Sequence, residues 1–224
     1  MLSREDQKFI SKEMKIALES IVSKLSEAAL LPYKKHLESA ISFFICSIRA
    51  QNRSGYICDS GSCRQSPAQI EINNYSAELS ETLAGTEAIS TLESLRHAFS
   101  CFAYNGLHQL FARQENEDWH PKVILDEELM PNDISELPSL VTLYRGTDIA
   151  EYNSSSYGQS WTTCKEIACL FAFTHYVGQP WFNKNERVVL KAEISKKYVY
   201  FSNQSGEFEV VVNVSEILHV EKVA

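Results

Sequence analysis

The spacing of hydrophobic residues changes once along the chain, and this change constrains the fold more than any other feature. Up to about residue 113, apolar side chains recur at the three- and four-residue spacing of amphipathic helices. After residue 136 they gather in β-branched runs, Val188-Val189-Leu190 and Val210-Val211-Val212, which are typical of buried strands. We therefore expect an α+β protein, with a helical region over residues 1–135 and a β-rich domain over residues 136–224.

Apolar stripes predict three helices in the helical region, over residues 4–30, 33–49 and 86–113. Residues 51–74 are rich in Ser, Gly, Asn and Gln, which favours a long loop. In the β-rich domain we expect a helix and five strands. The helix is expected over residues 165–177, and the strands over 141–144, 187–194, 198–201, 208–214 and 217–220.

The charge of the chain disfavours non-specific nucleic-acid binding and indicates where a phosphate-bearing ligand would fit. The 224 residues include 21 Lys and Arg and 29 Asp and Glu, for a formal net charge of −8. Proteins that coat nucleic acid without sequence preference are usually basic, so this class is disfavoured. Residues 136–224 contain 8 basic and 10 acidic side chains, so a phosphate-bearing ligand is better accommodated there than in the more acidic helical region.

Apolar runs and cysteines indicate the setting of the protein. No run is long and apolar enough to span a bilayer, and the first residues are charged where a signal peptide is apolar, so we expect a cytoplasmic protein with no membrane partner. The six cysteines are dispersed. Cys58 and Cys63 lie close together, but no second pair of Cys or His ligands follows, so no metal site is expected.

Three segments of the β-rich domain carry side chains suited to chemistry. In the first, Arg145 closes a predicted strand and Gly146 follows it. A guanidinium at a strand end can bind an anionic group, and a glycine beside it lets a ligand approach the backbone. A surface arginine before a turn is the structural alternative.

The second segment contains Ser160, Trp161 and Thr162, just before the helix predicted from residue 165. The two hydroxyls and the aromatic ring are consistent with the lining of a pocket. They are equally consistent with a threonine that caps the helix and a tryptophan that belongs to the core.

The third segment contains Glu207 and Glu209 on either side of Phe208. If these residues form one strand, alternation places both carboxylates on the same face. Two neighbouring carboxylates repel each other, so the pair indicates either an exposed strand edge or a paired-carboxylate site.

In this order, the three segments resemble the arginine–serine–glutamate clade of the ADP-ribosyltransferase superfamily, whose members include bacterial toxins. The resemblance covers about residues 140–222 and depends on the order and spacing of the motifs. It implies a split β-sandwich core on which the helical region packs. Many members have Ser-Thr-Ser where this chain has Ser160-Trp161-Thr162, which leaves open whether Ser160 or Thr162 fills the serine role.

The resemblance implies a mono-ADP-ribosyltransferase, which transfers ADP-ribose from NAD to a protein side chain or a nucleic acid and releases nicotinamide. Glu209 would stabilise the positive charge that develops on the ribose, and Glu207 would activate the acceptor. NAD is the only cofactor implied, as a substrate and without a metal. The implied contacts to NAD come from Arg145, Gly146, Ser160, Trp161, Thr162 and Glu209, and the implied catalytic set is Glu209, Glu207, Arg145 and Ser160.

The expected setting is a bacterial or phage toxin, a toxin–antitoxin component or an antiviral defence effector, with a neutralising protein as a possible partner. Two alternatives remain open. One is an NAD glycohydrolase that uses water as the acceptor. The other is a transferase-like module without activity that only binds a partner.

Overall fold

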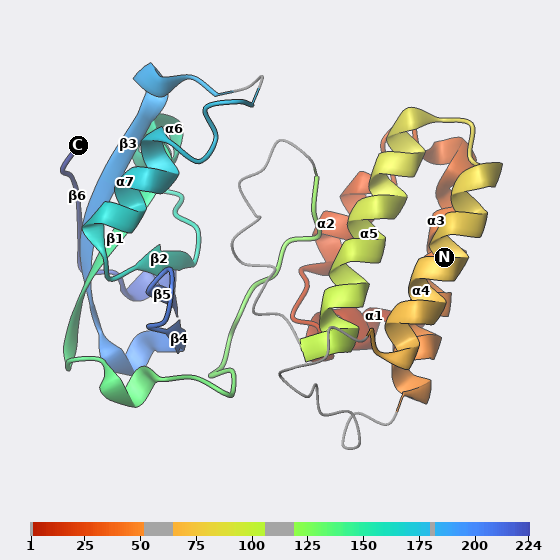
Figure 1. Ribbon diagram of the computed structural model, residues 1–224, viewed down its shortest axis with the longest axis horizontal. Coiled ribbons are helices and arrows are strands. Elements are labelled where there is room, and N and C mark those ends of the chain that lie inside the picture. Colours follow the sequence, from red (N-terminus) through yellow and green to blue (C-terminus); the bar gives the residue numbers. More distant parts are fainter. Residues whose placement is uncertain (1, 52–64, 106–118, 180–181) are drawn as a thin grey trace. The chain divides into compact units, whose positions relative to one another are not determined.

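The computed structural model describes residues 2–51, 65–105, 119–179 and 182–224. The protein is α+β and divides into two compact units, Met1–Ile124 and Leu125–Ala224 (Figure 1). The division falls before the position expected from the sequence, because residues 125–135 bond to the second unit. The backbone N–H of Leu125 donates to the Gln159 side chain, and that of Leu129 donates to the carbonyl of Tyr200.

The first unit is helical, and its three long helices α3, α4 and α5 pack against one another (Figure 1). Its fully buried side chains include Phe44 of α3 and Phe99 of α5, whose ring centroids lie 5.7 Å apart. The elements are α1 (Arg4–Lys8), a π-helical turn η1 (Phe9–Glu13), α2 (Leu18–Lys24), a 3₁₀ turn η2 (Leu31–Tyr33), α3 (Lys34–Ala50), α4 (Pro67–Thr82) and α5 (Thr86–Asn105).

The single helix expected over residues 4–30 is wrong, because the chain breaks between η1 and α2. Lys15 has a φ of 54°, and Ile16 forms an antiparallel bridge with Val123. Ile16 is only 1% exposed, so this break buries its side chain through a pairing with a distant segment. Local periodicity does not contain that long-range pairing.

Helix α4 was also not expected, since residues 51–74 were predicted to be a loop. Ser66 caps α4 with its side chain, Gln69 returns a bond to the Ser66 backbone, and Pro67 takes the first helical position. This capping box is a strong start signal that the polar composition obscured. The predicted helical residues 106–113 and the Cys58–Cys63 pair lie outside the described residues.

The second unit contains one antiparallel sheet of six strands in the order β4-β5-β2-β1-β3-β6. All five expected strands are present with shifted ends, and β2 is an additional strand between β5 and β1. The strands are β1 (Leu140–Asp148), β2 (Ser160–Thr162), β3 (Arg187–Ser195), β4 (Val199–Asn203), β5 (Glu209–Val212) and β6 (His219–Lys222). The other elements are η5 (Ile134–Glu136), α6 (Ile149–Ser154), α7 (Lys165–Phe173), η6 (Lys184–Glu186), η7 (Lys196–Tyr198) and η8 (Val214–Glu216).

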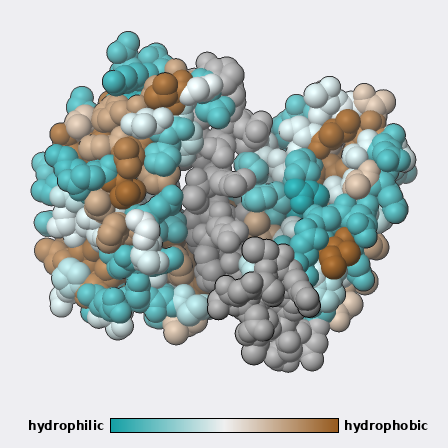
Figure 2. All heavy atoms as spheres, in the orientation of Figure 1, coloured by the Kyte–Doolittle hydropathy of each residue, from teal (hydrophilic) through white to brown (hydrophobic). Residues whose placement is uncertain are grey.

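The two faces of the sheet have separate cores. Helix α7 lies across β1 and β3 (Figure 1), where Ala168 and Ala172 pack on Val189. The larger core on the other face includes Leu143 and Trp161. Hydrophobic residues also reach the surface of both units, among hydrophilic ones (Figure 2). Within the described ranges, no helix has the length and apolar character needed to cross a bilayer.

Candidate functional site

The side chains of Ser160 and Glu209 meet on neighbouring strands, although 49 residues separate them in the chain. Strands β2 and β5 pair with Thr162 opposite Glu209 and Ser160 opposite Val211. Alternate residues of a strand share a face, so Ser160 and Glu209 form a diagonal pair on one face of the sheet. The Ser160 hydroxyl donates a hydrogen bond to Oε1 of Glu209 at 2.8 Å.

Glu209 has an unusual proton affinity for a glutamate. Burial raises its pKa to about 7, the hydrogen bond from Ser160 opposes this shift, and the nearby charge of Glu207 adds to it. A carboxyl group with a pKa near neutrality, held by a hydroxyl on the next strand, is a combination that is typical of functional sites.

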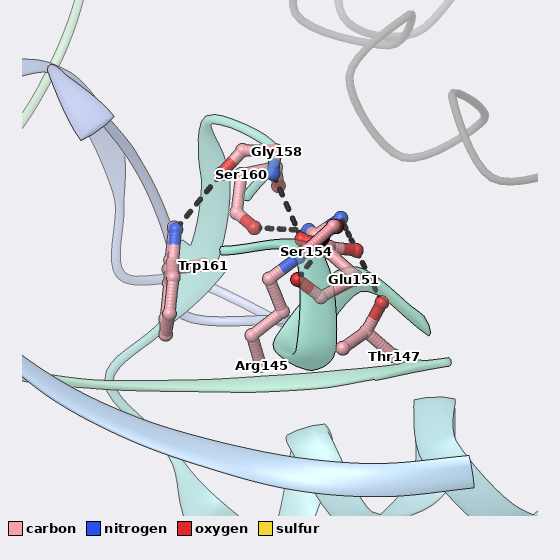
Figure 3. A network of polar contacts seen from close by, with 7 residues as sticks. All are labelled: Arg145, Thr147, Glu151, Ser154, Gly158, Ser160 and Trp161. Atoms are coloured by element: carbon pink, nitrogen blue, oxygen red, sulfur yellow. Dashed lines mark hydrogen bonds and ion pairs between the residues drawn. The ribbon is translucent and has the colours of Figure 1, made fainter. Parts of the chain in front are cut away.

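Arg145 lies on β1, the other neighbour of β2, and it reaches Ser160 through the main chain. Its Nη1 donates to the Ser160 carbonyl oxygen at 2.5 Å. Its Nε and Nη2 donate to the carboxylate of Glu151 at 2.8 and 3.2 Å (Figure 3). The structure therefore joins Arg145 to the strand of Ser160, and the Ser160 hydroxyl is left to Glu209.

Glu151, in the first turn of α6, is a member of this site that the sequence analysis missed. Its carboxylate also accepts the Thr147 hydroxyl and, at 2.8 Å, the backbone N–H of Gly158. Burial alone would raise the pKa of Glu151, but the Arg145 charge and these hydrogen bonds outweigh burial and lower the pKa. The side chains of Arg145 and Glu151 are 11% and 15% exposed, so this ion pair is largely but not fully buried. The only sequence signal was an acid after the helix cap Asp148, and that pattern is common.

Gly146 is needed for packing. A Cβ at this position would lie 2.1 Å from the carbonyl oxygen of Ala168 and 2.5 Å from the backbone nitrogen of Ala172, both in α7. Because these are backbone atoms, the helix could not give way without moving as a whole. The glycine lets α7 approach β1, so the space expected for a ligand on this side is filled by the helix.

Trp161 belongs to the core of the sheet. It is 3% exposed, packs edge-on against Tyr157 and donates its indole N–H to the carbonyl of Gly158 at 2.9 Å (Figure 3). Alternation along β2 places its ring on the face opposite to Ser160 and Thr162. Of the two options left open by the sequence, this position agrees with a core tryptophan.

Thr162 is engaged with the backbone. Its hydroxyl donates to the carbonyl of Glu207 at 2.8 Å and accepts from the backbone N–H of Cys164 at 3.1 Å. Of the two candidate hydroxyls, Ser160 is therefore the one that is bonded to Glu209.

The Glu207 side chain is exposed and precedes β5, so the expected alternation of Glu207 and Glu209 along one strand is wrong. Phe208 has a φ of 52°, which turns the chain immediately before the strand begins. The two carboxylates therefore belong to different local structures. Glu207 lies on a loop, and Glu209 lies on the sheet.

Another charged side chain of the sheet is paired away from Ser160 and Glu209. Lys191 pairs with Glu221 on the neighbouring strand at 3.1 Å. Among the residues that the structure describes, no group of three or more His, Cys, Asp or Glu side chains is placed to hold a metal ion. Comparison of the chain with protein-family models, curated proteins and solved structures finds no match.

Proposed function

We propose that the unit of residues 125–224 is an ADP-ribosyltransferase core of the split β-sandwich type, which transfers ADP-ribose from NAD to a macromolecular acceptor. The observation that carries this proposal is the hydrogen bond between Ser160 and Glu209 on neighbouring strands. A further feature supports it: a single residue pair, Tyr144–Thr162, joins β1 to β2 in the fully described ranges of these strands, as expected where a sheet begins to divide.

The proposed reaction begins with cleavage of the bond between C1′ of the ribose and the nicotinamide nitrogen. The electron pair leaves with nicotinamide, and positive charge develops on the ribose. The ionised Glu209 carboxylate stabilises this charge and accepts a hydrogen bond from the ribose 2′-hydroxyl. Ser160 holds one oxygen of Glu209, so the carboxylate is oriented before the substrate binds.

Transfer is completed when a nucleophile of the acceptor forms a bond to C1′ and loses its proton. We assign the base for this proton to Glu207, which is exposed and lies two residues before Glu209. The expected setting as a toxin or defence effector requires that the activity be restrained inside the cell that contains it. We therefore retain a neutralising protein as an expected partner.

The test is incubation of the protein with a cell lysate and NAD that is labelled in its adenylate phosphate. We expect label in protein or nucleic acid, and we expect Glu209→Gln to reduce labelling by about 100- to 1,000-fold because it removes the stabilising charge. Glu186→Gln, an exposed glutamate on η6, is the matched control. Free labelled ADP-ribose without labelled macromolecules would identify a glycohydrolase. Intact NAD would refute the proposal and leave the inactive binding module.

A further inference from the structure

We infer that Glu151 is a positioning residue for the reaction, which fixes the first residues of β2 and thereby holds Ser160 against Glu209. This inference rests on the proposed function for its catalytic consequence. Its structural part, that Glu151 orders Arg145 and the segment Gly158–Ser160, stands on contacts alone.

The Glu151 carboxylate is saturated by donors of the protein. Oε1 accepts from Arg145 Nε and from the Gly158 N–H, both at 2.8 Å. Oε2 accepts from Arg145 Nη2 at 3.2 Å and from the Thr147 hydroxyl. Each carboxylate oxygen thus has two donors, and a substrate could bind Glu151 only by displacing one of these donors. Glu151 is suited to hold other groups and not to contact a substrate.

The groups that Glu151 holds converge on the start of β2. Arg145, which is bound to Glu151, also donates to the Ser160 carbonyl. The Trp161 indole N–H donates to the Gly158 carbonyl from the core side (Figure 3). A Cβ on Gly158 would lie 2.6 Å from Arg145 Nη2, so the guanidinium lies directly against this glycine. The main chain of the segment is therefore held at the Gly158 N–H, the Gly158 carbonyl and the Ser160 carbonyl. These bonds leave the Ser160 hydroxyl for Glu209.

Strand β2 pairs with β5 along its whole length, whereas its attachment to β1 depends mainly on the bonds of Arg145 and Glu151. Strand β2 has three residues, and it joins β1 through one residue pair. A displacement of this short strand would change the contact of Ser160 with Glu209, and a misplacement of about 1 Å can cost about 100-fold in rate. A largely buried ion pair that ties β1, α6 and β2 together restricts that displacement.

The experiment compares wild type, Glu151→Gln, Ser160→Ala and the double variant, with Glu186→Gln as the control. In assays of NAD cleavage, we expect Glu151→Gln to lower kcat by about 10- to 100-fold and to change the KM for NAD by less than about threefold. Because Glu151 acts through Ser160, the double variant should be no more than about twofold slower than Ser160→Ala alone. If Glu151→Gln only reduced the fraction of folded enzyme, it would lower kcat by the same factor with and without Ser160→Ala. The loss in the double variant would then be the product of the two single losses.

A second readout is independent of activity. Glu151→Gln should shift the NMR resonances of the Gly158 amide and the Trp161 indole N–H, the latter assigned with Trp161→Phe. If Glu151→Gln does not fold, Thr147→Val removes a single bond to Oε2, and it should shift the same resonances and lower kcat by a few-fold.

The outcomes separate the two proposals. Unchanged kcat in a Glu151→Gln enzyme, multiplied losses in the double variant, or unmoved resonances would each overturn the positioning role. A wild-type protein that does not cleave NAD would refute the proposed function, and the two resonances would then decide whether Glu151 orders Gly158–Ser160.

Discussion

The β1–α6 corner and the β2–β5 ladder each contain a partly buried carboxylate, and the two carboxylates have opposite environments. Glu151 receives a guanidinium, a hydroxyl and a backbone N–H, and its pKa is lowered. Glu209 receives one hydroxyl and has a second carboxylate nearby, and its pKa is raised to about 7. The protein therefore stabilises the negative charge of Glu151 and leaves the negative charge of Glu209 poorly compensated.

Under the proposed function, this difference separates a structural carboxylate from a reactive one. A carboxylate that is fully bonded to the protein has little to offer a substrate, whereas an under-compensated one gains stabilisation when positive charge appears beside it. The following predictions are arranged to break or sharpen this contrast, from the largest expected effect to the smallest.

The largest effect is expected at Glu207, the loop carboxylate beside the β2–β5 ladder, which has no counterpart at the β1–α6 corner. Glu207→Gln should reduce transfer to the macromolecular acceptor by about 100-fold or more, because the acceptor loses its base. Cleavage of NAD with water as the acceptor should be retained, since Glu209 and Ser160 are unchanged. The measurement is labelled NAD, with transfer and free ADP-ribose quantified in the same reaction. Equal losses of both would show that the two carboxylates do not divide the work.

The second prediction is that removing the charge of Glu209 and removing the charge of Glu151 have opposite effects on the free energy of unfolding at pH 8. The folded pKa of Glu209 is about 7 against an ordinary 4.5, so the folded state retains a proton that the unfolded chain releases as pH rises. Stability falls across this window, and the full penalty of about 3 kcal/mol is reached above pH 7. Glu209→Gln should recover up to that amount at pH 8 and gain little at pH 4.5.

Glu151 has the reverse sign. Its folded pKa is lowered, so its contribution is present above the ordinary pKa and is lost as pH falls below it. Glu151→Gln should cost about 1–3 kcal/mol at pH 8, because Arg145 loses its charged partner. Native-state hydrogen exchange of the β1 and β3 amides measures the 125–224 unit by itself. Variants that shift stability in the same direction would contradict the contrast.

The smallest effect is expected in the pH profile of NAD cleavage. Because the ionised form of Glu209 acts, kcat/KM should rise with pH through a limb near 7. Ser160→Ala removes a hydrogen bond that lowers the Glu209 pKa, so the limb should move to higher pH. Glu207→Gln removes the repelling charge, so the limb should move to lower pH. Each shift should be within about one pH unit, and a limb that neither variant moves would belong to another group.

The sequence was sufficient to predict the class of the fold. The β-branched runs of β3 and β5 are dictated by burial and are visible in the residues themselves. The resemblance grouped Arg145, Ser160 and Glu209 in one site, and of these the side chains of Ser160 and Glu209 are bonded to each other. The roles of Gly146 and Trp161 were ambiguous, because packing against α7 or into the core depends on elements that are distant in the chain.

The parts that were missed depend on long-range partners or on a misread local signal. Lys15 interrupts the first helix because Ile16 pairs with Val123, and no local pattern encodes that bridge. Glu151 became visible only when its partners Arg145 and Gly158 were placed beside it. Helix α4 was different, since its capping box at Ser66 is written in the sequence and was outweighed by composition.

The loop before β5 is attached to the sheet by bonds that do not involve the Glu209 carboxylate. Thr162 holds the Glu207 carbonyl, the Thr163 backbone N–H holds the Phe208 carbonyl at 3.0 Å, and the Thr163 hydroxyl holds the Gln204 side chain at 2.7 Å. Under the proposed function, the acceptor base Glu207 lies on this loop and the cleavage residues lie on the sheet, so the two steps use separable pieces of the chain. The loop could then be exchanged to redirect the enzyme to a new target while the cleavage machinery stays intact.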